Sequence, residues 1–161
     1  MSDHFEAAII LATGAHAGQP DKQGQPYILH PLAVMLSGET EAERIVGVLH
    51  DTVEDTDITL DEIQGLFGAE VADAVDALTR RPGESYGDFI FRARRNEVAK
   101  RVKVNDIRHN LSRMNGLRPS EAKGLTAKYR RALAILFDIV NTWDEAAIYE
   151  DRDIEYTGAV G

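Results

Sequence analysis

Apolar residues recur three or four positions apart through most of the chain, which is the spacing of one face of an α-helix. In the first such segment they are Phe5, Ala8, Ile9, Ala12 and Ala15. No run of strand length alternates between apolar and polar residues, and the sequence contains no internal repeat and no glycine-rich phosphate loop after a strand. The pattern predicts an all-α fold in which helices pack on helices.

Breaks between the apolar stripes divide the chain into short helices. Glycine or proline ends most segments, and Thr59 with Glu62 forms the capping-box pattern that starts one of them. Pro31 stands where the first turn of a helix tolerates proline, so we expect His30 at a helix entrance. The predicted helices cover residues 5–17, 31–36, 39–55, 59–67, 69–79, 85–95, 98–114 and 119–140.

The size and composition of the chain fit one globular unit. Its 161 residues can build one domain with a sizeable core, and we predict a domain at 1–140 followed by an acidic tail at 141–161. Because the chain has no cysteine, any metal must be held by nitrogen and oxygen. The net charge of −9 disfavours nucleic acid as a partner, and no apolar stretch is long enough to span a membrane. We therefore expect a cytoplasmic protein.

The segment from His50 to Asp55 carries the strongest chemical signal. It reads His-Asp-Thr-Val-Glu-Asp and closes the predicted helix 39–55. If that helix continues to its end, Asp51 and Asp55 share a face, with His50 and Glu54 beside it. Carboxylates are rarely buried without a positive charge, and where a histidine is also present that charge is usually a divalent metal. The cluster predicts a metal site, and the alternative is a solvated helix end with one incidental histidine.

Three separated stretches of the chain resemble one protein family. They are His16–Gln19 with Lys22, Gly24 and the block Pro26–Pro31; then His50–Thr56; and then Val102–Asn110. Together they resemble the HD-domain hydrolases of the RelA/SpoT group, most closely the small alarmone hydrolases similar to the metazoan SpoT homologue. The resemblance covers residues 5–136 and implies an HD-domain helical bundle.

The resemblance also implies an activity and a site. The family uses one divalent metal, usually manganese (Mn²⁺), to remove pyrophosphate from the 3′ position of guanosine tetra- and pentaphosphate, (p)ppGpp, which ends the stringent response. The family's metal ligands match His30, His50, Asp51 and Asp106. Its two catalytic carboxylates match Glu54 and Asp55. Its substrate contacts match Lys22, Lys103 and Asn110. Because no synthetase region follows Gly161, we expect a chain that degrades the alarmone without making it.

The chemistry of the residues agrees with this resemblance. Hydrolysis of a phosphate ester beside several negative charges needs a Lewis acid and an activated water, and one metal can supply both. Two histidines with two aspartates suit manganese or a similar borderline cation, because oxygen ligands alone would favour magnesium or calcium. Either Glu54 or Asp55 could accept the proton of the attacking water. His109 is expected at the surface.

Asp21 departs from the family pattern. Many members have an arginine here that packs against the guanine base, whereas a carboxylate only accepts hydrogen bonds and repels phosphates. As a substrate contact, Asp21 could accept from the amine of adenine, so (p)ppApp is an alternative substrate, and a nearby arginine could also take the missing role. Two other readings stay open. One is hydrolysis of another nucleotide phosphate, such as the 2′-phosphate of NADPH, and the other is a metal- or nucleotide-binding module without turnover.

Overall fold

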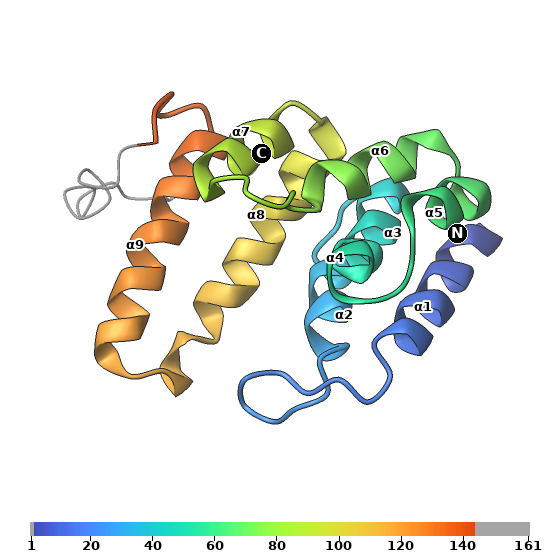
Figure 1. Cartoon of the computed structure of the whole chain (residues 1–161), viewed down its shortest axis with the longest axis horizontal. Coiled ribbons are helices and arrows are strands. Elements are labelled where there is room, and N and C mark those ends of the chain that lie inside the picture. The colour runs from blue at the N-terminus through green and yellow to red at the C-terminus, as the bar shows by residue number, and fades with distance from the viewer. Residues whose placement is uncertain (1, 144–161) are drawn as a thin grey trace.

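A computed structural model describes residues 2–143 and confirms the all-α prediction (Figure 1). Within that range the only β-type pairing is an isolated bridge between Pro20 and Pro26. The helices are α1 Asp3–Ala15, α2 Leu29–Leu36, α3 Glu41–Leu49, α4 Thr52–Asp55, α5 Leu60–Phe67, α6 Ala69–Leu78, α7 Tyr86–Arg94, α8 Glu97–Ser112 and α9 Pro119–Leu136, with a 3-10 turn, η1, at Met114–Gly116. None of these helices is both long and apolar enough to cross a membrane. Most of the predicted tail lies outside the described residues.

Helix boundaries follow the local signals in the sequence. The Thr59 hydroxyl accepts from the Glu62 amide and the Glu62 carboxylate accepts from the Thr59 amide, which completes the predicted capping box of α5. Gly68 then ends α5 with a φ of 86°, a conformation that glycine adopts without steric cost. The last helix ends at Leu136 rather than at 140. The structure thus confirms these elements and shifts some of their ends.

One predicted helix is broken, because residues 39–55 form α3 and α4 instead of a single helix. The break falls at His50 and Asp51, where the Thr52 hydroxyl donates to the Leu49 carbonyl at 2.7 Å. A threonine hydroxyl that bonds a nearby carbonyl competes with the helical hydrogen bonds. The prediction of one continuous helix is therefore wrong, although the Asp55 amide still donates to the Asp51 carbonyl at 2.9 Å within α4.

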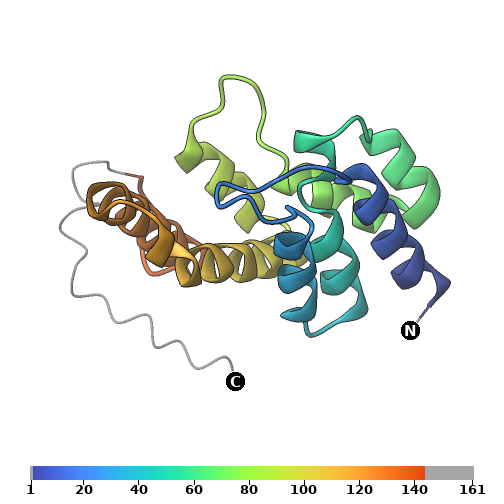
Figure 2. The same cartoon turned by 90° about the horizontal axis from the view of Figure 1, so that it is seen from below.

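The central helix α8 joins two hydrophobic cores. It contributes Ala99 and Val102 to the first core, which α1 to α6 surround. It contributes Val104 and Ile107 to the second core, which lies between α7, α8 and α9. Figure 1 shows α8 between the two groups of helices, and Figure 2 shows the same arrangement from below. Residues of α8 that face neither core are therefore available for a site between the two groups.

Gly47 allows α3 to approach α2 closely. A Cβ atom at this position would lie 3.1 Å from both the backbone nitrogen and the Cα of Met35. Any larger residue would push the two helices apart. Their close packing places His30, in the first turn of α2, beside His50, just after α3, with ring centroids 5.3 Å apart. This packing brings the first two predicted ligands together.

A largely buried ion pair holds the loop between α6 and α7. Arg92 Nε lies 2.7 Å from Glu84 Oε1, and the two side chains are only 19% and 12% exposed. Arg92 also donates to the carbonyls of Asp76 and Thr79, near the end of α6, at 2.8 Å. The hydrogen bonds from Arg92 are the main reason that the pKa of Glu84 falls to about 2. The pair therefore ties α7 to the end of α6.

Glu84→Gln should lower the free energy of unfolding by about 1–3 kcal/mol at about pH 7. The folded pKa of about 2 lies below the ordinary 4.5. The stabilisation is therefore fully present above pH 4.5 and is lost as the pH falls toward 2. Urea unfolding should show a difference from wild type that shrinks between about pH 7 and about pH 3. An equal difference at the two pH values would contradict the assignment of the lowered pKa to Glu84. The control is Glu121→Gln, which breaks an exposed pair with Arg118 and should cost about 0.5 kcal/mol or less.

Candidate metal centre and adjoining cavity

Four side chains from separate segments converge at one point. His30 lies in α2, His50 and Asp51 lie at the break between α3 and α4, and Asp106 lies in α8. Ligand atoms of His30, His50 and Asp106 all lie within 4.8 Å of one another. The structure therefore brings together the four residues that the sequence predicts as metal ligands.

The two carboxylates face the Nε2 atoms of both imidazoles. Asp51 Oδ2 lies 3.0 Å from His50 Nε2 and 3.8 Å from His30 Nε2. Asp106 Oδ1 lies 3.1 Å from His30 Nε2 and 3.9 Å from His50 Nε2. Three of the residues are buried, and the Asp51 side chain is 20% exposed. The donor atoms of His30, His50 and Asp106 are thus close enough to share one ion, and Asp51 Oδ2 lies next to both imidazoles. Bonds of such an ion to these ligands measure about 2.0–2.2 Å.

The hydrogen bonds of both histidines leave their Nε2 atoms for a cation. His50 Nδ1 lies 2.7 Å from the Gly47 carbonyl, which places the proton on Nδ1. The buried Nε2 of His50 has no hydrogen bond of good geometry within the described residues. His30 Nδ1 lies 2.7 Å from His109 Nδ1 and can donate to it. Metal-ligating histidines are usually held through the second nitrogen in this way. The residues present therefore fit a divalent metal.

Two neighbours on α8 orient Asp106. Lys103 Nζ donates to Oδ2 and Asn110 Nδ2 donates to Oδ1, both at 2.7 Å. The three residues share one helix face, because they are three or four positions apart. Burial alone would raise the pKa of Asp106, but the Lys103 ammonium, helped by His30 and His50, holds that pKa below its ordinary value. Asp106 is therefore an anion inside the protein.

The charges around Asp51 favour a positive charge beside it. The Tyr27 hydroxyl donates to Asp51 Oδ2, and burial together with the Asp51 charge keeps that phenol protonated by raising its pKa. Burial would raise the pKa of Asp51, but the neighbouring His50 lowers it to about 2. Burial would lower the pKa of His50, but Asp51 raises it to about 9. The attraction that favours a proton on His50 is equally available to a metal cation.

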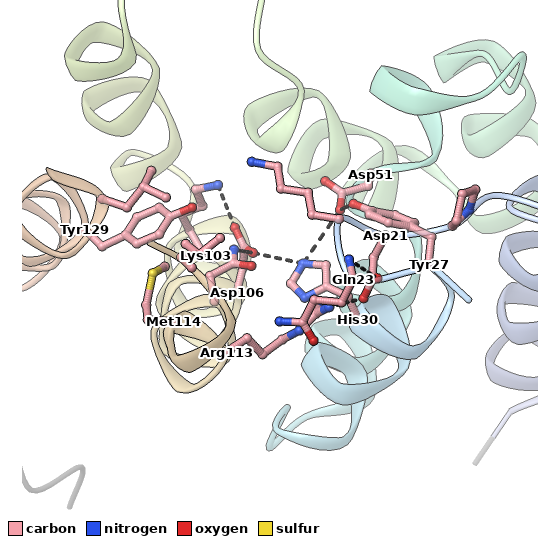
Figure 3. A pocket seen from close by; sticks show the side chains of 15 residues that line it. Asp21, Gln23, Tyr27, His30, Asp51, Lys103, Asp106, Arg113, Met114 and Tyr129 are labelled. Carbon is pink, nitrogen blue, oxygen red and sulfur yellow. Dashed lines mark hydrogen bonds and ion pairs between the residues drawn. The ribbon is translucent and has the colours of Figure 1, made fainter. Parts of the chain in front are cut away.

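A cavity of about 420 Å³ opens beside this cluster (Figure 3). Its polar part includes His30, Asp51, Asp106, Lys103, Asn110 and Arg113, and the loop between α1 and α2 adds Asp21 and Lys22. Its apolar part, from η1, α9 and the segment between them, consists of Met114, Leu117, Leu125 and Tyr129. In Figure 3, Met114 and Tyr129 lie on the side away from Asp21 and Tyr27. The cavity thus offers charged and apolar walls to one ligand.

Comparison with protein families identifies one family whose model covers both the fold and the cluster of predicted ligands. A family model described as an HD domain matches residues 8–118, a range that includes all four predicted metal ligands. The chain belongs to the HD-domain family. HD-domain hydrolases bind a divalent metal, and the cluster of His30, His50 and Asp106 could hold one.

This HD domain is similar to parts of longer proteins. It is 32% identical over 165 residues to a Synechocystis protein named as a probable guanosine-3′,5′-bis(diphosphate) 3′-pyrophosphohydrolase, and the match covers 92% of this chain and 22% of that protein. It is 28% identical over 167 residues to the Aquifex aeolicus protein with that enzyme name, covering 96% and 24%. A Myxococcus xanthus protein named GTP pyrophosphokinase is 44% identical over 82 residues, which is 48% of this chain and 11% of that protein. The chain thus spans no more than 24% of the length of these relatives.

A solved structure shares the same fold. It is described as a metazoan ortholog of SpoT that hydrolyses ppGpp, and it matches 94% of both chains with a TM-score of 0.72 and 22% identity. At that identity the likeness establishes the fold. It agrees with the HD-domain helical bundle that the sequence predicts.

The two predicted catalytic residues of the HD domain lie on α4, three and four positions after the predicted ligand Asp51. Glu54 is exposed, and its Oε2 accepts from the Arg80 amide at 2.9 Å, so the loop between α6 and α7 anchors it. Burial and the charges of Asp51 and Glu54 raise the pKa of Asp55. Neither residue is among those that line the cavity. Their catalytic roles stay predictions.

Sequence reasoning missed two polar parts of the site. His109 was expected at the surface, which is wrong, because its ring is partly buried and stacks on His30 with centroids 4.9 Å apart. Arg113 lines the cavity and forms an ion pair with Asp21. A signal for Arg113 was present, since it extends the spacing of Lys103, Asp106 and Asn110 along one helix face by three positions.

Proposed function

We propose that this HD domain hydrolyses the 3′-pyrophosphate of (p)ppGpp or of a related alarmone such as (p)ppApp, giving the nucleotide and pyrophosphate. One observation carries the proposal: His30, His50, Asp51 and Asp106 converge beside a cavity of about 420 Å³. That volume falls within the range of sites for small molecules such as a nucleotide. The proposed partner is therefore a small nucleotide.

Manganese is the proposed metal, with His30, His50, Asp51 and Asp106 as its ligands. Two imidazole nitrogens and two carboxylate oxygens suit a borderline cation of this kind. When bound, such a cation supplies Lewis-acid polarisation of a phosphoryl oxygen and makes water nucleophilic at neutral pH. Lys103 and Asn110 keep the Asp106 carboxylate oriented toward the ligand cluster, at 2.7 Å each.

Glu54 is the proposed general base. It lies in α4, one turn from Asp51, and only its Oε2 accepts from the Arg80 amide, so Oε1 can take the proton of the attacking water. Asp55 stands beside it, and its raised pKa makes it better able to hold a proton than an ordinary aspartate. We propose that the two carboxylates share the proton transfers of the reaction.

The substrate's phosphates need local cations because the chain carries a net charge of −9. Lys22 lies exposed on the rim of the cavity, and Lys103 lines its interior. Asn110 offers a polar amide on the same face of α8. We propose that these three residues contact the nucleotide, as the matching positions do in the family. The names of the relatives in Synechocystis and Aquifex aeolicus support the same substrate class.

The test is an assay of product release with and without metal. Protein freed of metal by a chelator should release no pyrophosphate from ppGpp, and addition of Mn²⁺ should restore the release. The same preparation should be offered ppApp, NADPH and simple nucleoside monophosphates. Phosphate release from NADPH without pyrophosphate release from ppGpp would contradict the proposal and indicate a phosphohydrolase that acts on another nucleotide phosphate. Binding of Mn²⁺ and ppGpp without any turnover would show that the protein is a binding module and not a hydrolase.

A further inference from the structure

An ion pair between Asp21 and Arg113 forms part of the cavity wall. Arg113 follows α8, and its Nη2 donates to Asp21 Oδ2 in the loop between α1 and α2, 92 positions away in the sequence. The Asp21 side chain is 8% exposed and that of Arg113 is 29% exposed. Figure 3 shows the Arg113 side chain extending from α8 toward Asp21 beside His30. The pair thus links two walls of the cavity.

The hydrogen-bond acceptors of Asp21 are already used within the protein. Its Oδ1 accepts from the amides of Gln23 and Gln25 at 2.8 and 2.9 Å, and its Oδ2 accepts from Arg113. Burial would raise its pKa, but these hydrogen bonds and the Arg113 charge hold it below the ordinary value. Asp21 is therefore a fixed anion that positions Arg113, with little capacity left to accept from the amine of an adenine base.

Arg113 still has donors to offer a ligand. A guanidinium carries five N–H groups and no acceptor. Within residues 2–143 the one hydrogen bond that Arg113 makes runs from Nη2 to Asp21 and uses one of these N–H groups. The other four, which include one adjacent pair, remain for a ligand in the cavity. Met114, the next residue, belongs to the apolar wall with Leu117 and Tyr129. Apolar side chains of the cavity suit the face of a purine, and a planar donor suits its edge.

We propose that Arg113, positioned by Asp21, is the residue that selects the base of the substrate, and that it selects guanine. This inference rests on the proposed hydrolysis, in which the 3′-pyrophosphate lies at the metal cluster and the base lies toward Met114 and Leu117. Guanine presents two acceptors, O6 and N7, on one edge, whereas adenine presents N7 and a donor amine there. A side chain with only donors can satisfy both guanine atoms and leaves the adenine amine unpaired.

Two measurements on the metal-loaded protein test this selection. The first is calorimetric binding of guanosine 3′,5′-bisphosphate and adenosine 3′,5′-bisphosphate, which carry no pyrophosphate to release. The second is kcat/KM for ppGpp and ppApp. Wild type should prefer guanine by about tenfold or more in both, the discrimination that one bidentate arginine contact gives. Arg113→Gln should remove this preference, chiefly by raising KM for ppGpp. Asp21→Asn keeps an oxygen for the two backbone amides but repels the guanidinium, and should weaken the preference.

The control is Arg118→Gln, since Arg118 pairs with Glu121 at the start of α9, is 81% exposed and does not line the cavity. It should leave the base preference unchanged. The proposal is overturned if wild type shows no preference for guanine. It is also overturned if Arg113→Gln weakens the binding of both nucleotides equally, because Arg113 would then contact only phosphate or only stabilise the fold. If hydrolysis of ppGpp fails while the bisphosphates still show the preference, the proposed function fails and the base selection stands.

Discussion

Replacement of Glu54 by glutamine should reduce kcat for ppGpp by about 10²–10⁴-fold, the usual contribution of a general base. Glutamine cannot take a proton from water, but its oxygen can still accept the hydrogen bond that the Arg80 amide donates at 2.9 Å. The local structure of α4 should therefore persist. Since Glu54 is not one of the four residues that converge on the metal position, Mn²⁺ content and substrate KM should change little.

The measurement is steady-state hydrolysis of ppGpp together with metal analysis of the same preparation. Glu70→Gln is the matched control, because Glu70 is an exposed glutamate in the first turn of α6, and it should retain full activity. If Glu54→Gln stays within a few-fold of wild type, Glu54 is not the base. Asp55→Asn then becomes the decisive variant, since Asp55 is the other carboxylate on α4 and burial raises its pKa.

Local sequence signals were sufficient to predict most of the fold. The capping box at Thr59 and the glycine at Gly68 fix both ends of α5, and the structure has them where the residues indicate. The break after α3 could not be predicted in the same way. Residues 39–55 keep a helical spacing, and helix propensity does not indicate that the Thr52 hydroxyl bonds the Leu49 carbonyl at the break.

The site likewise has parts that the sequence could predict and parts that it could not. The four predicted ligands could be named because their motifs resemble a family, and the structure then places His30 Nε2 and Asp106 Oδ1, 76 positions apart in the sequence, at 3.1 Å. Contacts that depend on tertiary packing could not be predicted in this way, although Arg113 continues the helix face of Asp106 and Asn110. The His109 ring reaches His30, and Arg113 reaches Asp21, only because α8 packs beside α2 and the preceding loop. The type of a residue alone does not show whether it lies on the solvated surface or in a site.

Asp106→Asn should abolish both the response to metal and the hydrolysis. Asparagine keeps the size of the side chain but removes one of two anions, while Asp51 and the two imidazoles remain. Mn²⁺ at about 100 times its Kd should stabilise the wild type by about 2.7 kcal/mol, because it binds only the folded state. That corresponds to a rise in Tm of roughly 5–10 °C for a chain of this size. The variant should show little or no rise.

A loss of folding could imitate this result, because Asp106→Asn leaves the Lys103 ammonium without the carboxylate that it contacts at 2.7 Å. An unpaired buried charge is destabilising by about 3–5 kcal/mol. The double variant Lys103→Met/Asp106→Asn removes the charge as well and should recover much of the Tm without recovering the Mn²⁺ response. Asp73→Asn, an exposed change on α6, should behave as wild type. A normal Mn²⁺ response in the stable double variant would show that Asp106 is not a ligand, and the four-ligand centre would then be wrong.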